Sequence, residues 1–251
     1  MTDENLQQAA PMTDENLQRT ALLAGDDMMA SMADTRIIVF GVGGVGSWCV
    51  EALARTGFGH ITLVDPDEVA PSNLNRQLPA LHSTLGLPKV EVLARRIADI
   101  NPACEVTAIA GAYTPDNADT FRIDTYDYVV DAIDSLADKA DLILRCTDPA
   151  TGPRRKFVSS MGAARKMHPD KVSTAEFWKV DGCPLARALR TRFRRSGIFP
   201  KRKFTCVYSP ETLPHRKEGP RGVNGTFAHA TAVFGLTLAS LIVDNEYRLT
   251  Q

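Results

Sequence analysis

One short segment, a β-branched run that breaks into glycines, constrains the fold of this chain more than any other. The run is Arg36–Phe40 (RIIVF), and the glycines that follow are Gly41, Gly43, Gly44 and Gly46 in the pattern GVGGVG. A buried strand, a glycine-rich turn and a helix N-terminus together let backbone amides approach a pyrophosphate. The segment therefore predicts a nucleotide-binding unit, without distinguishing a nicotinamide cofactor from ATP.

The rest of the chain continues the alternation of strands and helices. Apolar spacing and turn residues predict helices near residues 26–33, 47–56, 88–100, 134–146, 184–195 and 227–243. They predict further strands near residues 60–65, 105–109, 126–131, 156–160, 172–178 and 204–208. This alternation indicates the α/β class, with a doubly wound, Rossmann-like, mainly parallel sheet, helices on both faces and a small mixed C-terminal extension.

Domain organisation follows from the two ends of the pattern. MTDENLQ occurs twice within residues 1–18, and this polar, acidic segment is expected to be largely disordered. Residues 19–251 have the length of one domain. Within them, residues 187–203 form a basic stretch with eight cations and no acid: Arg187, Arg190, Arg192, Arg194, Arg195, Lys201, Arg202 and Lys203.

Composition narrows the possible classes of function. The hydrophobic fraction of 44% and charged fraction of 24% are those of a globular protein, and a formal net charge of -1 gives no global attraction to nucleic acid. Five cysteines without a C-x-x-C pair argue against a disulfide framework and a zinc site, and favour a reducing cytoplasm. No signal peptide and no membrane span are expected from the apolar runs.

A polar stretch after the second strand favours ATP over a nicotinamide cofactor. It reads SNLNRQ over residues 72–77 and is followed by Lys89. Adenylation places negative charge on the α-phosphate and the departing pyrophosphate, which fixed cations stabilise, whereas hydride transfer needs an apolar nicotinamide bay. Asp65 suits the ribose hydroxyls of either cofactor. Asp134, after the predicted fourth strand, suits Mg²⁺ or the capping of the next helix.

Five motifs in order carry a resemblance to a known family: GVGGVGSW, VDPD, SNLNRQ, PKVE and DAIDS. They resemble the adenylating, ThiF-type domain shared by ubiquitin-activating enzymes and the bacterial activators of molybdopterin and thiamine sulfur carriers. Within that superfamily, the chain most resembles the tRNA threonylcarbamoyladenosine dehydratases. It lacks the two C-x-x-C pairs typical of sulfur-carrier activators, and SSMGAA, AEFWKV, CPL and CVYSPE in its second half resemble the dehydratases too.

The resemblance implies the reaction and its residues. A homodimer would use ATP and Mg²⁺ to adenylate the carboxylate of threonylcarbamoyladenosine in tRNA, and ring closure would then release AMP. Arg76, Lys89 and Asp134 would be catalytic, together with Arg19, which matches a family arginine that enters the partner subunit's ATP site. The implied nucleotide-binding set, with Asp134 as the Mg²⁺ ligand, is Gly41, Gly43, Gly44, Gly46, Asp65, Asp67, Asn73, Asn75, Arg76, Gln77, Lys89, Asp134 and Ser135.

Several alternatives stay open on the sequence. The chain could adenylate the C-terminal carboxylate of a small sulfur-carrier protein, or it could reduce or oxidise a substrate with a nicotinamide cofactor. A third alternative is a nucleotide-regulated interaction protein without enzymatic activity. A sulfurtransferase partner is also possible. The basic stretch, with Phe193 and Phe199 interleaved, either contacts tRNA phosphates or is a solvated face. Cys206 is either a reactive thiol or, more commonly for such a residue, a buried free cysteine.

Overall fold

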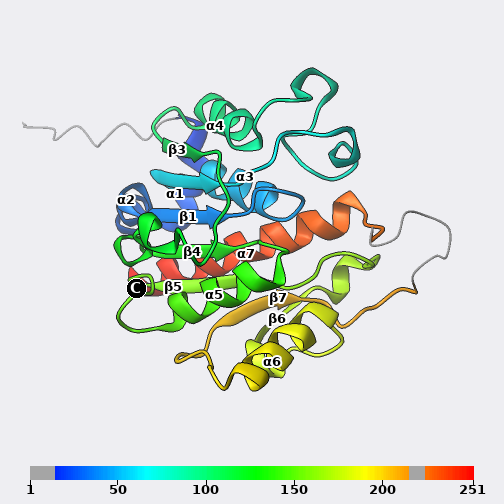
Figure 1. The fold of residues 1–251 in the computed structure, drawn as a ribbon. Helices are drawn as coiled ribbons and strands as arrows, with labels where there is room; N and C mark the ends of the chain where they lie inside the picture. Colours follow the sequence, from blue (N-terminus) through cyan, green and yellow to red (C-terminus); the bar gives the residue numbers. More distant parts are fainter. Residues whose placement is uncertain (1–14, 215–223) are drawn as a thin grey trace, which may run out of the picture.

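The structure, a computed structural model, describes residues 15–214 and 224–251 and is centred on a seven-stranded sheet (Figure 1). The strands lie in the order β3-β2-β1-β4-β5-β7-β6. Neighbouring strands are parallel except β6 and β7, which are antiparallel. Their bounds are β1 (Arg36–Phe40), β2 (His60–Val64), β3 (Glu105–Ile109), β4 (Tyr128–Asp131), β5 (Lys156–Ser160), β6 (Ser173–Glu176) and β7 (Thr205–Tyr208). This confirms the predicted mainly parallel sheet with a mixed C-terminal part.

Seven α-helices are found in the described part of the chain: α1 (Gln18–Ala24), α2 (Asp26–Asp34), α3 (Gly46–Thr56), α4 (Lys89–Ile100), α5 (Leu136–Thr147), α6 (Pro184–Ser196) and α7 (Ala228–Leu249). Short 3-10 segments are η1 (Glu15–Leu17), η2 (Pro71–Asn73), η3 (His82–Thr84), η4 (Ala118–Phe121), η5 (Ile123–Thr125), η6 (Pro169–Lys171) and η7 (Phe177–Lys179). None of these helices has the length and apolar character that crossing a membrane would need.

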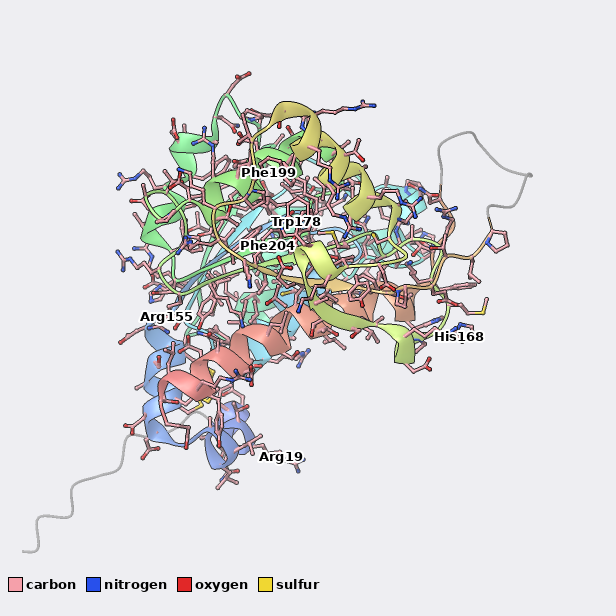
Figure 2. The ribbon with its side chains drawn as sticks, turned by 90° about the horizontal axis from the view of Figure 1, so that it is seen from below. Arg19, Arg155, His168, Trp178, Phe199 and Phe204 are labelled. Atoms are coloured by element: carbon pink, nitrogen blue, oxygen red, sulfur yellow. The ribbon has the colours of Figure 1, made fainter. Side chains whose placement is uncertain are left out.

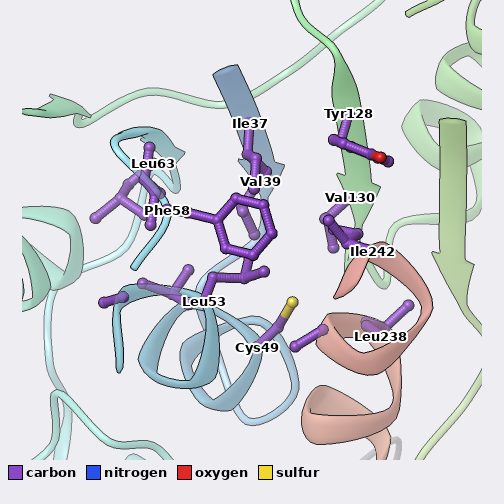
Figure 3. Packing of buried hydrophobic residues seen from close by; sticks show 14 of the residues in the cluster. Ile37, Val39, Cys49, Leu53, Phe58, Leu63, Tyr128, Val130, Leu238 and Ile242 are labelled. Atoms are coloured by element: carbon purple, nitrogen blue, oxygen red, sulfur yellow. The ribbon is translucent and has the colours of Figure 1, made fainter. Parts of the chain in front are cut away.

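Two hydrophobic cores cover the two faces of the sheet, as the alternation of side chains along β1 requires. Ile37 and Val39 pack with Leu53 of α3 and Leu238 of α7 in one core (Figure 3). Ile38 and Phe40 belong to the other core, with residues of α5 and α6. Because β1 is buried on both faces, its continuous β-branched run needs no polar residue.

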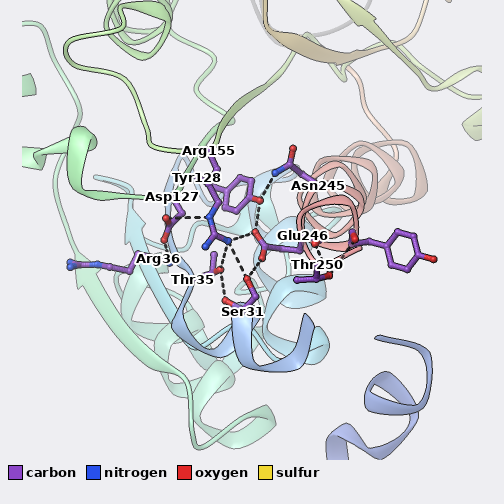
Figure 4. Close-up of polar contacts among 10 residues, drawn as sticks. Ser31, Thr35, Arg36, Asp127, Tyr128, Arg155, Asn245, Glu246 and Thr250 are labelled. Carbon is purple, nitrogen blue, oxygen red and sulfur yellow. Dashed lines mark hydrogen bonds and ion pairs between the residues drawn. The ribbon is translucent and has the colours of Figure 1, made fainter. Parts of the chain in front are cut away.

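The polar network at the amino end of the sheet joins α2 to the last helix, α7 (Figure 4). Glu246 of α7 is fully buried, and it accepts hydrogen bonds from Ser31 of α2, Tyr128 of β4 and Arg155. The Arg155 guanidinium also lies 3.5 Å from the Asp127 carboxylate. A buried carboxylate is tolerated when it is paired and hydrogen-bonded in this way. The network holds α2 at the end of the sheet opposite the glycine loop.

The structure differs from the sequence predictions mainly at element ends. Residues 15–18, within the segment expected to be largely disordered, form η1 and the start of α1, while residues 1–14 lie outside the described residues. The strand expected over 172–178 is shorter in the structure, where β6 ends at Glu176 because the chain turns into η7 at Phe177. Helix α5 begins at Leu136, two residues after Asp134, and α7 continues to Leu249. Helix α7 continues past Val243 because Glu246 is anchored in the polar network.

Candidate active site

A cavity of about 680 Å³ opens at the carboxyl ends of the central parallel strands. Its wall includes the residues that directly follow four of them, Gly41 after β1, Asp65 after β2, Ala132 after β4 and Met161 after β5. In open α/β sheets, ligands bind at this edge, and this volume falls within the range of small-molecule sites.

The glycine loop forms one side of the cavity and explains two of its glycines sterically. Gly41 has a φ of 85°, and a Cβ there would lie 2.7 Å from the Ala132 carbonyl oxygen. A Cβ on Gly46 would lie 1.8 Å from the Gly41 carbonyl oxygen. Gly41, Gly43 and Gly44 line the cavity, whereas Gly46 does not. The absent side chain of Gly46 lets α3 start against the loop, and its contact with a nucleotide stays a prediction.

Asp65 joins the second strand to the glycine loop. Its Oδ2 accepts a hydrogen bond from the Val42 amide at 2.7 Å, and its Oδ1 accepts one from the Asp67 amide at 2.9 Å. Burial raises the pKa of the Asp65 carboxyl above its ordinary value, while these two amides oppose the shift. A carboxylate has about four acceptor positions, so one that holds the loop can still accept ribose hydroxyls.

Two cations converge on the cavity from different segments. Lys89, at the start of α4, is 3% exposed, and its Nζ lies 2.7 Å from Asp67 Oδ2. Arg76 follows η2, lines the cavity and packs over Gly44. Its Nη1 donates to the Ser72 carbonyl and to Asn75 Oδ1, both at 2.8 Å. These contacts hold the Arg76 side chain at the cavity rim, and its positive charge stays available to a ligand.

The predicted asparagines support this segment instead of lining the cavity. Asn73 is buried, and its Oδ1 accepts a hydrogen bond from the Ala70 amide at 3.0 Å. Asn75 Nδ2 donates to the Thr226 carbonyl at 3.3 Å. Their amides shape the turn that carries Arg76, and their contact with phosphate stays a prediction.

Gln77, by contrast, does line the cavity. Its side-chain amide lies beside Gly43, and its buried Oε1 has no hydrogen-bond partner among the residues described. Buried polar atoms are normally satisfied, so an unpaired one in a cavity wall is a place where a ligand fits. The structure thus brings Gln77 into the predicted site.

Asp134 and Ser135 lie at the rim of the cavity, on the loop between β4 and α5. Both are exposed. Within residues 15–214 and 224–251, no hydrogen bond or ion pair engages the Asp134 carboxylate, and Ser135 occupies the N-cap position of α5. The alternative role of Asp134 as a helix cap therefore has no support, and its carboxylate is available to a ligand.

Arg19 is the one predicted catalytic residue that the structure keeps apart from the cavity. It is exposed on α1, beside the amino end of the sheet. Figure 2 shows its side chain extending into solvent, well away from the segment that carries His168. Within one chain, Arg19 does not reach the other predicted residues.

The basic stretch divides into anchored and exposed cations. Arg202 donates to the carbonyls of Cys146, Thr147 and Asp148 at the end of α5, and Lys201 pairs with Asp148 at 2.6 Å. Four exposed arginines of α6 have no acidic partner in the described part of the chain: Arg187, Arg192, Arg194 and Arg195. Within the described residues of this stretch, Lys203 is likewise exposed without an ion pair, so these four arginines and Lys203 present its free positive charge.

The two aromatic residues of this stretch have different environments. Phe193 is 1% exposed and packs against Phe177 in the core, so it cannot contact a ligand at the surface. Phe199 is 48% exposed and lies beside Trp178 (Figure 2). The interleaved pair expected from the sequence is therefore one core residue and one surface residue.

A second groove runs along α6 next to the main cavity. It is lined by Leu136, Pro184, Arg187, Ala188, Thr191, Arg192, Arg195 and Ser196, with a volume of about 730 Å³. Pro184 lines both hollows. The exposed arginines of α6 thus begin where the cavity ends.

Cys206 lies on β7 and is fully buried; the other four cysteines are also buried, and all five are free. Burial raises the pKa of the Cys206 thiol well above its usual value. Since the thiolate is the reactive form, this environment favours the structural interpretation of Cys206.

Sequence reasoning missed the segment after β5, which also lines the cavity. Arg165 and Lys166 lie there, directly after the SSMGAA motif. Lys166 is 2% exposed, and its Nζ donates to the Ser209 carbonyl at 2.8 Å and to that of Glu211. The sequence did offer one signal for this segment, which is its position directly after a predicted strand. The residues that follow β1, β2, β4 and β5 all line the same cavity.

Comparison with known proteins agrees with the geometry. The sequence matches the ThiF family over residues 15–244. The tRNA threonylcarbamoyladenosine dehydratase of Escherichia coli strain K12 is 39% identical over 87% of this chain and 88% of its own length. That of Bacillus subtilis strain 168 is 41% identical over 76% and 73%, respectively. The crystal structure of the E. coli enzyme in complex with ATP has a TM-score of 0.84 and 38% identity, covering 93% of this chain and 94% of that chain. The chain belongs to the ThiF family and, within it, to the tRNA threonylcarbamoyladenosine dehydratases.

Proposed function

We propose that the protein uses ATP to dehydrate N6-threonylcarbamoyladenosine in tRNA to its cyclic form. The observation that carries this proposal is the convergence of a glycine loop, two cations and a free carboxylate on one cavity: Gly41, Gly43, Gly44, Arg76, Lys89 and Asp134. Relatives that cover most of the chain carry this activity in their names, and the E. coli relative has been solved with ATP.

The chemistry uses the cavity in two steps. The substrate carboxylate attacks the α-phosphate of ATP, and pyrophosphate leaves. Ring closure on the acyl adenylate then expels AMP, so the water lost by the substrate is accounted for by cleavage of ATP. Arg76 and Lys89 would stabilise the negative charge that develops on the phosphates. Asp65 and Gln77 would orient the nucleotide over the glycine loop.

Mg²⁺ fits the donor set on the cavity rim. The described residues contain no group of three His, Cys, Asp or Glu side chains that would bind a metal by themselves. Mg²⁺ in nucleotide sites is usually held by one or two carboxylates together with phosphates and water. Asp134 would supply that carboxylate, and Asp67 and Ser135 would complete the polar wall around the phosphates.

A homodimer would bring Arg19 to an ATP site. Arg19 projects from α1, and Leu22 and Leu23 on the same helix are 83% and 87% exposed. Adjacent exposed leucines on a short helix suit burial in an interface. Two-fold symmetry would give each cavity one arginine from its partner. No separate sulfurtransferase or sulfur carrier is needed for the reaction as written.

The unit responsible would be the single adenylating domain over residues 19–251, with residues 187–203 as its basic tRNA-binding region and residues 1–18 outside it. The four exposed arginines of α6 begin beside the cavity, where they would bind phosphates flanking the modified nucleoside. ATP and tRNA are both cytoplasmic, and free cysteines suit that reducing compartment.

The test is mass analysis of the nucleosides of tRNA that carries threonylcarbamoyladenosine, after incubation with the protein, ATP and Mg²⁺. We expect the modified nucleoside to lose the mass of one water, with release of AMP and pyrophosphate. Arg76→Ala serves as the control with lowered activity. Unchanged tRNA, together with an adenylated sulfur-carrier protein in a parallel reaction, would overturn the proposal in favour of sulfur-carrier activation. If NAD stabilises the protein against heat and ATP with Mg²⁺ does not, the proposed selectivity for ATP over NAD is overturned.

A further inference from the structure

Arg165 lies in the cavity wall in a backbone conformation that arginine rarely adopts. Its φ is 58°, in the left-handed region, and Arg122 is the only other non-glycine residue with positive φ in the described part of the chain. This region is unfavourable for side chains with a Cβ. Such residues persist where the surrounding structure holds them, and they cluster at functional sites.

The backbone of Arg165 is held from both sides. Its amide donates to the Gly225 carbonyl at 2.9 Å, and its carbonyl accepts from the Leu213 amide at 3.1 Å. The carbonyl of Thr226, next to Gly225, accepts the hydrogen bond from Asn75. The wall that carries Arg165 therefore adjoins the segment that carries Arg76.

The two neighbouring cations of this wall use their charges differently. The Lys166 ammonium donates to the carbonyls of Ser209 and Glu211, so it anchors the segment. The half-buried Arg165 guanidinium has no hydrogen bond or ion pair to residues 15–214 or 224–251. A cation in a cavity wall without a protein partner is suited to an anionic ligand.

For Arg122, the left-handed backbone conformation has a local explanation. It joins η4 to η5, and its Nε lies 3.3 Å from Asp124 Oδ1. Its side chain is 68% exposed and does not line the cavity. The left-handed conformation of Arg122 thus comes with a turn and an ion pair. Among residues 15–214 and 224–251, no comparable side-chain contact accompanies Arg165.

The order of the strands decides which ligand Arg165 faces. Asp65 and Lys89 belong to the β2 side of the cavity, the glycine loop follows β1, Asp134 follows β4, and Arg165 follows β5. Strands β2 and β5 are three positions apart, which corresponds to roughly 14 Å. A nucleotide with its ribose at Asp65 and phosphates over the glycine loop leaves the β5 side to the second substrate.

We propose that Arg165 binds an oxyanion of the tRNA substrate, on the side of the cavity opposite the nucleotide's ribose; this rests on the proposed function. The oxyanion is the carboxylate of the threonylcarbamoyl group or a phosphate beside the modified nucleoside. A guanidinium binds either through two parallel hydrogen bonds. Bound in this way, the carboxylate would be held in line with the α-phosphate.

Arg165→Gly is the informative variant, because glycine adopts this conformation without a steric penalty. We expect a thermal midpoint equal to or above that of the parent protein and unchanged ATP affinity. We also expect kcat/KM for modified tRNA to fall by at least about tenfold. Arg122→Gly removes the same charge from the same backbone conformation away from the cavity, and should retain parental activity. Arg165→Lys should recover activity only in part.

Binding measurements separate the two oxyanions. Loss of affinity by Arg165→Gly for modified tRNA alone identifies the carboxylate, whereas equal loss for modified and unmodified tRNA identifies a phosphate. Parental kcat/KM in Arg165→Gly would overturn this inference while leaving the proposed function intact, and so would a loss of ATP affinity. A parent protein that converts no tRNA would instead overturn the proposed function itself.

Discussion

The Lys139 Nζ lies 2.8 Å from Asp131 Oδ2, and both side chains are fully buried. Lys139 also donates to the Ile133 carbonyl at 3.1 Å, and Asp131 Oδ1 accepts from the Ile133 amide at the same distance. Ser159 of β5 donates to Asp131 Oδ2 at 2.7 Å. The pair therefore fixes the loop that presents Asp134 to the cavity.

Replacement of this lysine should be strongly destabilising. In Lys139→Met, the Asp131 carboxylate stays buried without its partner, and breaking a buried pair in this way costs about 3–5 kcal/mol. Urea denaturation measures the loss. Lys201→Met is the matched control, because its pair with Asp148 is largely exposed and should contribute less than about 1 kcal/mol. Equal effects of the two substitutions would mean that the buried pair contributes no more to stability than the surface pair.

Arg76→Ala and Asp134→Ala should each lower turnover on tRNA by at least about tenfold, roughly 1.4 kcal/mol of transition-state stabilisation. Both side chains lie at the cavity rim and outside the two cores, so far-ultraviolet spectra should match the parent protein. Arg95→Ala, which removes an exposed pair with Glu91 on α4, is the control. Parental turnover in either variant would remove that residue from the site.

Mixed dimers test whether Arg19 acts across an interface. Arg19→Ala and Asp134→Ala chains should each have strongly lowered activity. Mixing them should restore part of it, because one hybrid site then carries neither substitution. Steady-state turnover after subunit exchange measures the recovery. If hybrid dimers are verified by mass and no activity returns, Arg19 acts in its own subunit or has no catalytic role.

Glu211 should make the segment after Arg165 sensitive to acid. Hydrogen bonds from the backbone amides of Met167 and His168, and then from the His168 side chain, lower the pKa of Glu211 from 4.5 to about 2. A carboxyl with a lowered folded-state pKa stabilises the protein above pH 4.5, and this contribution is lost as the pH falls toward about 2. Thermal midpoints of the parent protein and Glu211→Gln should converge over this range. Curves that stay parallel would show that Glu211 does not cause the acid dependence.

The exposed arginines of α6 should bind tRNA through its phosphates. Replacing Arg192, Arg194 and Arg195 by Ala should weaken tRNA binding and flatten its salt dependence, since each phosphate contact releases counterions. ATP affinity should stay near the parent value. Parental tRNA affinity and salt slope in the triple variant would mean that this helix is a solvated face.

Part of the site was readable from residue order because it depends on local structure. The β-branched run at Arg36–Phe40, followed by GVGGVG, specifies a strand, a turn and a helix start within a few residues. Parallel strands bring their carboxyl ends to one edge, so Asp65 and Asp134 could be placed together by counting strands.

The sequence by itself thus determined the family, the alternation of elements and the edge where a ligand binds. Only the tertiary structure decided how individual side chains are used. Asn73 shapes a turn, Phe193 lies in the core, and Arg165 lines the cavity. These outcomes depend on burial and on partners distant in sequence, such as Gly225 opposite Arg165, and no local pattern encodes which partner the fold will supply.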